Sequence, residues 1–286
     1  MARKNIFELV STNTTFEDDL RRLKTLIFSE ECIQCYGIYK YSISEFVDKY
    51  LFSSWEQRQH CVDLDDFLKT LKYNELYEKA LKQDFDSSVC VLELYYNLWN
   101  LVFQYILKSD DTKHYESFNF VNNLLRDCLS AINYTYHFFG EDTILLVEDK
   151  PEITAVAEIV DDDLALDIIR YNHHSLAGDI ESKKSILLRL GSELEPKRKE
   201  LKVINKQLED NIFYMLNNLN LRHNNRSKKD KNYKEYVAKM KKSKLEDWYD
   251  ELYQEILLAM LLLDDKNRQI KISGLKDKIN TTKQVV

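Results

Sequence analysis

Two short stretches of the chain carry residues that could move protons and hold a phosphate. The first contains Arg170, His173 and His174, and the second is the run at residues 217–225. A histidine exchanges protons near neutral pH, and an arginine can hold a phosphate through two parallel hydrogen bonds. Such a set could cleave RNA without a metal, with one base taking the 2′-hydroxyl proton while donors hold the scissile phosphate.

The second stretch is the preferred catalytic site. It reads Asn-Asn-Leu-Asn-Leu-Arg-His-Asn-Asn, so Arg222, His223 and Asn224 follow one another. We expect it where one long helix ends, and catalytic residues gather on loops that rigid elements position. The alternative is a plain turn, because asparagine is common at helix ends and in turns.

The first stretch would supply partners across a pair of helices. On a helix, Arg170, His173 and His174 share one face because residues three and four apart are neighbours. The alternative is that the two histidines simply end a helix, where the dipole favours positive charge. The catalytic hypothesis requires the two stretches to come together when the helices fold.

Charge is unevenly distributed along this acidic chain, whose formal net charge is −7. Residues 222–244 contain ten Lys and Arg against two acidic residues, whereas residues 141–167 contain ten acidic residues and one Lys. Lysines interleaved with tyrosines suit a phosphate backbone with stacked bases. The alternatives are a solvated loop and a segment that docks on acidic residues of the same or a partner chain. The expected nucleic-acid contacts are Lys183, Lys184, Arg226, Lys228, Lys229 and Tyr233.

Lys183 has a second explanation that needs no nucleic acid. It lies four residues after Asp179, and an ion pair at this spacing stabilises a helix by about 0.2–0.5 kcal/mol.

Nothing in the sequence requires a metal or an organic cofactor. Cys32 and Cys35 have the spacing of zinc ligands, and His60 with Cys61 could supply a second pair. The favoured alternative is unpaired thiols. The chain has no Gly-rich phosphate loop and no HExxH sequence. We therefore expect no cofactor.

Cysteine usage and hydropathy indicate a cytoplasmic protein. The five cysteines are odd in number and spread over the chain, as is typical of reduced thiols. No apolar run is long enough for a transmembrane helix, so we expect no membrane contact.

The scarcity of turn formers predicts a mainly all-α fold. Only 5 glycines and 2 prolines occur among 286 residues, which favours long uninterrupted helices. We expect a helical bundle with long antiparallel C-terminal helices. The one exception is a small β-hairpin over residues 143–159, with a helix over 153–160 as the alternative.

We expect three parts, two helical domains and a β-hairpin between them. These are an N-terminal helical domain (1–140), a hairpin connector (141–160) and a C-terminal helical domain with the candidate site (161–286). The N-terminal domain should contain an apolar helix over 88–108 and an antiparallel partner over 116–138. In the C-terminal domain we expect a kink at 191–196, helices over 197–218 and 244–263, and a polar tail that is frayed over 278–286.

At Arg170–His174 and Leu221–Asn225 the chain resembles the helical HEPN ribonucleases and the HEPN-bearing abortive-infection proteins of bacterial phage defence. Members are small helical bundles, often dimeric, that cleave RNA without a metal. Their motif has an Arg, an adjacent polar residue and a His four to six residues further on. Here three residues separate Arg170 from His174, and Arg222 directly precedes His223. The resemblance covers at most residues 164–263. It implies Arg170 or Arg222 as phosphate holder and His174 or His223 as acid and base.

Two function hypotheses follow from these patterns. The first is a metal-independent RNA-cleaving effector of a phage-defence or toxin type. The second is a non-catalytic helical scaffold that dimerises and binds an acidic partner or nucleic acid through residues 222–244.

Overall fold

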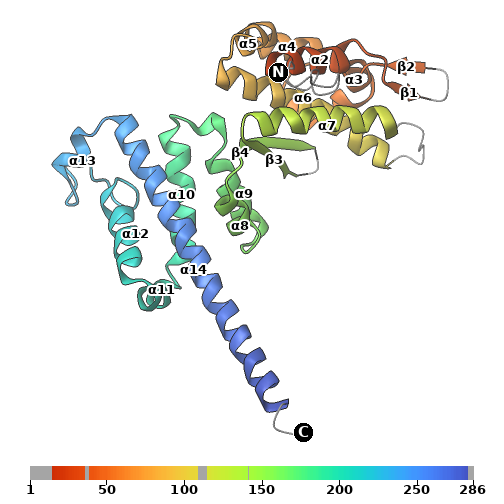
Figure 1. Ribbon diagram of the computed structural model, residues 1–286. Coiled ribbons are helices and arrows are strands. Elements are labelled where there is room, and N and C mark those ends of the chain that lie inside the picture. Colours follow the sequence, from red (N-terminus) through yellow and green to blue (C-terminus); the bar gives the residue numbers. More distant parts are fainter. Residues whose placement is uncertain (1–14, 36–38, 109–114, 141, 283–286) are drawn as a thin grey trace, which may run out of the picture. The chain divides into compact units, whose positions relative to one another are not determined.

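The computed structural model describes residues 15–35, 39–108, 115–140 and 142–282; of residues 35, 115–119, 281 and 282 it describes the backbone alone. The chain divides into two compact units, Met1–Asp149 and Lys150–Val286. The fold is mainly helical, as predicted (Figure 1). The boundary places the strand at 143–148 in the N-terminal unit, so the expected separate connector is not present as a part of its own.

The N-terminal unit contains helices and two small antiparallel hairpins. The helix that begins at Phe16 starts with a capping box, in which Thr15 accepts a hydrogen bond from the Asp18 amide and Asp18 accepts one from the Thr15 amide. Its elements are α2 (Phe16–Phe28), β1 (Ile33–Cys35), β2 (Tyr39–Tyr41), α3 (Ile43–Phe46), the single-turn helices η1 (Val47–Leu51), η2 (Phe52–Ser54) and η3 (Glu56–Arg58), α4 (Leu64–Thr70), α5 (Tyr73–Ala80), α6 (Phe85–Lys108), α7 (Tyr115–Ala131), β3 (Tyr134–Phe139) and β4 (Thr143–Glu148).

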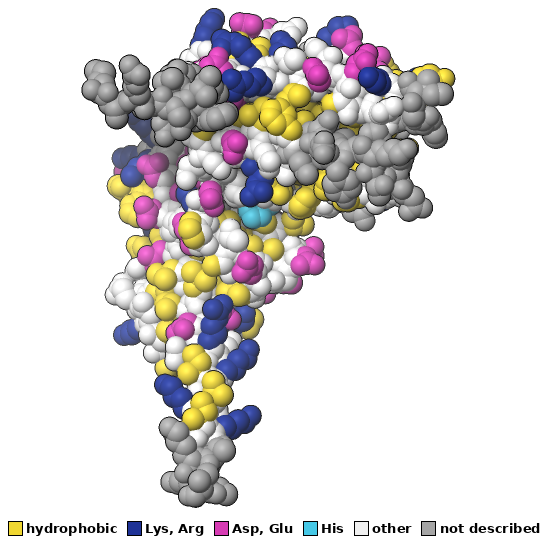
Figure 2. Space-filling view, turned by 45° about the vertical axis from the view of Figure 1, so that its right-hand side comes forward, with side chains coloured by type: hydrophobic (Ala, Val, Ile, Leu, Met, Phe, Trp, Pro, Cys, Tyr) yellow, Lys and Arg dark blue, Asp and Glu magenta, His cyan; other side chains and the backbone are white. Residues whose placement is uncertain are grey.

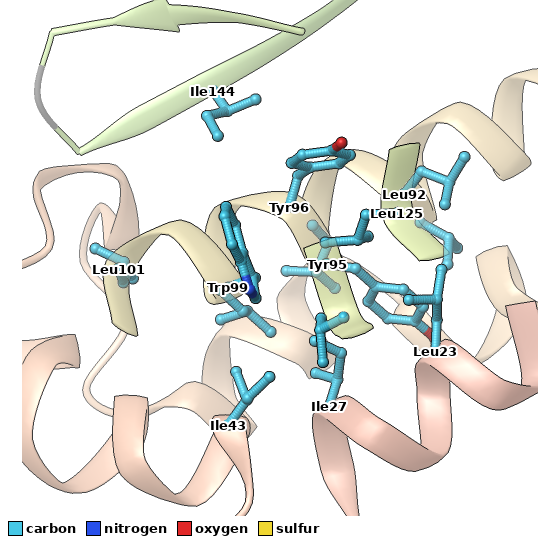
Figure 3. Packing of buried hydrophobic residues seen from close by; sticks show 14 of the residues in the cluster. Leu23, Ile27, Ile43, Leu92, Tyr95, Tyr96, Trp99, Leu101, Leu125 and Ile144 are labelled. Carbon is cyan, nitrogen blue, oxygen red and sulfur yellow. The ribbon is translucent and has the colours of Figure 1, made fainter. Parts of the chain in front are cut away.

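Helix α6 forms the centre of this unit. Its sequence is apolar around most of its circumference, and Tyr95 and Tyr96 are fully buried within it. Helices α2, α3 and α7 and strand β4 contribute side chains to the same core (Figure 3). A helix that is apolar on more than one face must be covered on several sides, which explains this arrangement.

The β-hairpin near residue 143 has a different partner from the predicted one. Strand β4 pairs with β3, and residues 153–157 belong to helix α8 (Pro151–Ala157). Pro151 occupies the first turn of α8, where its missing N–H costs nothing. The predicted helix over 116–138 ends at Ala131, because the aromatic and β-branched run at 134–139 favours a strand.

Two polar side chains of α6 satisfy the backbone of β4. Asn97 donates to the Ile144 carbonyl (2.9 Å) and accepts from the Ile144 amide (2.8 Å). Glu93 accepts from the Leu146 amide at 2.8 Å. A two-stranded sheet has two edges, and α6 covers one of them in this way.

The cysteines give no support to the predicted zinc alternative. Burial raises the pKa of the Cys32 thiol to about 11, which disfavours the thiolate that zinc requires. The buried Cys61 thiol lies 4.0 Å from the Thr70 hydroxyl. The side chain of Cys35 lies outside the described residues.

The C-terminal unit is a bundle of helices around one long helix, α14. Its elements are α8, α9 (Asp162–Tyr171), η4 (His174–Leu176), α10 (Ile180–Leu194), α11 (Arg198–Ile204), α12 (Lys206–Asn218), α13 (Glu235–Lys239) and α14 (Lys242–Thr282).

Two salt bridges show the relative directions of the long helices. Lys183 near the start of α10 pairs with Glu246 near the start of α14, and Glu200 in α11, the helix that follows α10, pairs with Lys266. Helices α10 and α14 are therefore parallel, and α12 runs antiparallel to both (Figure 1). Helices α10 and α12 pack closely, since a Cβ atom on Gly191 would lie 2.9 Å from Leu216.

One helix boundary agrees with the prediction for 191–196 and two others differ. The chain passes through Gly191 as helix and breaks between Leu194 and Arg198, next to Pro196. The predicted helix over 197–218 is two helices, because Asn205 is extended and caps α12 through the Leu208 amide. The last helix continues from Lys242 to Thr282, well past the predicted end at 263. No helix among the described residues carries the long apolar run needed to cross a membrane.

Candidate nucleic-acid interface

The predicted motif at 217–225 begins in the last turn of α12, which ends at Asn218, and continues as a closed loop. The Asn220 amide donates to the Asn225 side chain (2.8 Å), and the Asn225 amide donates to the Asn220 side chain (3.2 Å). Asn220 has φ = 61°, a conformation that asparagine tolerates better than most residues. We call these two residues the asparagine pair.

Asn225 also joins this loop to the next one. Its side-chain amide donates to the Asn232 carbonyl at 2.8 Å, and its own carbonyl accepts from the Lys234 amide at 2.8 Å. Asn225 is completely buried, and the bonds that its side chain makes are partly shielded from water. The role of Asn225 is therefore structural: it holds residues 220–234 in one conformation.

The three residues of the preferred catalytic site have different roles in this loop. The Asn224 side chain accepts from the amides of Arg226 (3.2 Å) and Ser227 (3.1 Å), which is a turn-forming role. His223 is exposed. Asn224 is exposed too, but its side chain is engaged in the turn, whereas the exposed His223 side chain makes no such turn bond.

Arg222 belongs to a charged cluster at the far end of α10. Its guanidinium pairs with Glu195 at 2.5 Å and lies 5.4 Å from the centre of the Phe213 ring. Arg198 lies 4.2 Å from the same ring centre and pairs with the buried Glu209 at 2.5 Å. Arg222 thus ties the loop to the end of α10 and to α12, and Arg198 ties α11 to α12.

The first stretch does not form the predicted helical face. Helix α9 ends at Tyr171, and Asn172 is its C-cap. His173 lies beyond that end and caps η4, with its Nδ1 atom 2.7 Å from the Ser175 hydroxyl. The rings of His173 and His174 lie 4.2 Å apart, and both residues are half-buried. Arg170 is exposed on the last turn of α9.

The two stretches lie at opposite ends of α10. His173 and His174 precede its first residue, whereas the Arg222 guanidinium is held by Glu195 just beyond its last residue. A helix of 15 residues is about 22 Å long. Arg222 and the two histidines therefore cannot hold one phosphate within a single chain.

Lys183 is not available to a nucleic acid. It is 7% exposed, and its ammonium lies 2.8 Å from both Glu246 and Asp250. Burial alone would lower the pKa of Lys183, but the hydrogen bonds to Asp250 and Glu246 raise it. Lys183 was predicted to contact nucleic acid or to pair with Asp179, and both predictions are wrong. Its acceptors come from α14, and Asp179 instead caps α10 through the Ser182 amide.

Arg226 is likewise a structural residue. Its guanidinium donates to the Met240 carbonyl at 3.1 Å, which fastens the loop to the end of α13. Lys228 and Lys229 are exposed, whereas Lys184 and Tyr233 are half-buried. The exposed positive charge of the basic segment, residues 222–244, is therefore carried by its lysines.

A groove of about 480 Å³ runs beside the basic segment, between α12, α13 and α14. Three of its aromatic side chains are solvent-accessible: Tyr214 is 68% exposed, Tyr236 is 74% exposed and Trp248 is 37% exposed. The lining is mostly apolar. Its remaining residues are Asn211, Met215, Asn218, Leu219, Lys234, Val237, Met240, Glu251 and Glu255. We call it the α12–α14 groove.

Lysines of the basic segment border the α12–α14 groove. Lys234 lines it, and the Lys244 ammonium lies 5.5 Å from the centre of the Trp248 ring. Exposed aromatic rings with cations beside them form a surface on which bases can stack while phosphates are neutralised.

Tyr214 and Trp248 were not among the predicted nucleic-acid contacts. Tyr214 directly follows the buried Phe213, so it points away from the apolar face of α12. That offset from the helical period was readable in the sequence. Trp248 lies on α14 and borders the groove.

Comparisons of the chain with known protein families, with curated proteins and with solved structures gave no match. The resemblance to HEPN proteins therefore stays a prediction.

Proposed function

We propose that this protein binds single-stranded RNA. The bases would stack on Tyr214, Tyr236 and Trp248 in the α12–α14 groove, and lysines of the basic segment would neutralise the phosphates. The observation that carries this proposal is the exposure of three aromatic side chains in one groove that a lysine-rich segment borders.

Single strands fit this surface better than duplexes do. Stacking requires bases that can leave their partners, and recognition of single-stranded RNA relies on aromatic platforms of this kind. Glu251 and Glu255 line the same groove and could accept hydrogen bonds from base amino groups. Their negative charge opposes phosphate, so the backbone would follow the lysine side of the groove.

The proposal is tested by measuring the fluorescence anisotropy of a labelled single-stranded RNA as the protein is added. Changing Tyr236 to Ala, or Tyr214 to Ala, should weaken binding by at least ~5-fold, because each stacked base contributes about 1–3 kcal/mol. Tyr39, an exposed tyrosine of the N-terminal unit, provides the matched control, and Tyr39→Ala should bind as the wild type does. Equal affinities for all three variants would refute the groove as the binding site.

RNA cleavage is the second candidate function, and the exposed His223 beside Arg222 favours it. In this case the loop would act alone, since α10 separates it from His173 and His174. The same RNA is incubated with wild type and with His223→Ala, and its length is read on a denaturing gel. Cleavage that is lost in the variant at an unchanged melting temperature supports catalysis. If the wild type binds the RNA but does not cut it, cleavage is refuted and RNA binding is the function that is left.

A further inference from the structure

The last part of α14 extends beyond the bundle. Leu263 is buried and Lys266 pairs with Glu200 at 2.7 Å, but every described side chain from 267 to 280 is exposed. Figure 2 shows this part of α14 at the bottom of the view, where hydrophobic side chains lie between those of Lys and Arg. Large apolar residues are among them: Ile270, Ile272, Leu275 and Ile279 are 41–63% exposed.

A single helical extension of this kind is marginal in water. Isolated helices of this length lack the tertiary packing that normally stabilises them, and Gly274 costs about 1 kcal/mol relative to Ala. Ile272, Leu275 and Ile279 nevertheless lie on one stripe, at steps of three and four residues. The extension therefore has the properties of a helix that is stabilised by packing against another helix.

The stripe follows a heptad pattern along the exposed side of α14. Continued toward the bundle at the same alternating steps, it includes Arg268, Asp265, Leu261 and Leu258. Leu258 is 47% exposed, Leu261 is half-buried, and both charged residues are exposed. These are the a and d positions of a coiled coil, with one acid and one base at the centre of an otherwise apolar seam.

The order of these residues is self-complementary for two antiparallel helices. When a positions face d positions of a second copy around a two-fold axis between 266 and 267, Asp265 of each copy faces Arg268 of the other. In the same register Leu258 faces Leu275, and Leu261 faces Ile272. A parallel pair would instead place Asp265 against Asp265 and Arg268 against Arg268, and like charges in contact disfavour that arrangement.

We propose that a second copy of this chain pairs antiparallel with α14 over residues 258–279. Within one chain, Arg268 pairs with Asp264 at 2.5 Å and Asp265 accepts from Gln269 at 3.3 Å, so the second copy adds to these contacts. The apolar pairs stabilise the dimer, and the central charges favour the antiparallel over the parallel direction.

Charge reversal at the seam tests the pairing by sedimentation velocity over a range of full-length protein concentrations. The wild type should be dimeric at high micromolar concentration. Asp265→Arg faces Arg268 and Arg268→Asp faces Asp265, so each variant alone should dissociate at least ~10-fold more readily because like charges meet. An equimolar mixture of the two variants should dimerise again, since both charge pairs are then opposite. Both substituted positions are exposed, and an unchanged melting temperature shows that each variant is folded.

Disulfide formation tests the direction. Leu258→Cys and Leu275→Cys should cross-link to each other when mixed under oxidising conditions, and neither should cross-link efficiently with itself. The wild type, with its native cysteines, gives the background. A monomeric wild type at every concentration would overturn the proposal, and so would single variants that dimerise as the wild type does. Self-cross-linking of Leu258→Cys would overturn the antiparallel register.

Discussion

Positive charge has opposite surroundings in two regions of the C-terminal unit. Near the start of α10, Lys183 is buried between Glu246 and Asp250 and lies 5.3 Å from the centre of the Tyr171 ring. In the basic segment, Lys228 and Lys229 are exposed. The first region joins α10 to α14, and the second leaves its charge available to a partner.

The difference comes from what packs around each lysine, because the residue type is the same. Helix α14 brings two carboxylates to Lys183, and the Gly178 amide donates to one of them, Glu246, at 2.7 Å. Around Lys228 and Lys229 the asparagine pair fixes the backbone through neutral side chains and leaves the lysines outside. A lysine is thus structural or available according to where acidic side chains fall in the fold.

Removal of the buried ammonium should have the largest effect. Lys183→Met keeps the length of the side chain but leaves Glu246 and Asp250 facing each other without a cation. We expect a loss of about 2–3 kcal/mol in the free energy of unfolding, because breaking a buried pair strands its partner charge, and the half-exposed Asp250 can regain water. Urea denaturation measures it, with the half-buried Lys184→Met as control. A loss no larger than that of Lys184→Met would show that the buried pair does not stabilise the unit.

Removal of the buried asparagine should have the next largest effect. Asn225→Ala leaves the part-buried Asn220 amide and Asn232 carbonyl without their partners, for an expected loss of about 1–2 kcal/mol. Asn224→Ala removes two exposed turn bonds and should cost less. Urea denaturation of both variants separates the two neighbours, and equal losses would contradict a structural role specific to Asn225.

Acid should reduce the loss of stability that Lys183→Met causes. Burial alone would raise the pKa of Glu246, but the hydrogen bonds from Lys183 and Gly178 lower it below the ordinary 4.5. A lowered carboxyl pKa stabilises the folded state above the unfolded pKa, and this stabilisation is lost as the pH falls through the folded value. The raised Lys183 pKa acts at the other limit, where stability is lost as the pH rises through a value above 10.5.

The difference in melting temperature between wild type and Lys183→Met should therefore be constant near neutral pH and shrink below about pH 4. A difference that is independent of pH down to acid unfolding would mean that Glu246 does not contribute through its charge.

Local patterns in the sequence predicted local structure well. The Thr15–Asp18 capping box depends only on residues three apart in the chain, so a short stretch of sequence is enough to indicate it. The helical class followed from the scarcity of Gly and Pro. The helix over 153–157 was the alternative to the predicted strand, and short apolar runs do not separate these two periods.

Contacts between distant segments could not be predicted in the same way. The acceptors of Lys183 come from α14, and the partner of β4 comes from before it in the chain. The motif at 217–225 was identified as a loop after a helix, but the division of roles inside it depends on burial: Asn225 is enclosed and His223 is exposed. The α12–α14 groove combines three helices, so no single stretch of sequence contained it.

The proposed RNA binding depends on the exposed lysines of the basic segment, which would neutralise the phosphates. The direct measurement is the affinity for single-stranded RNA as a function of salt, for the wild type and for a variant with both Lys228→Gln and Lys229→Gln. We predict that affinity falls steeply with salt, and that the variant lowers the logarithmic slope by about 1–2, at an unchanged melting temperature. Binding that is insensitive to salt, or a variant with the slope and affinity of the wild type, would contradict the claim.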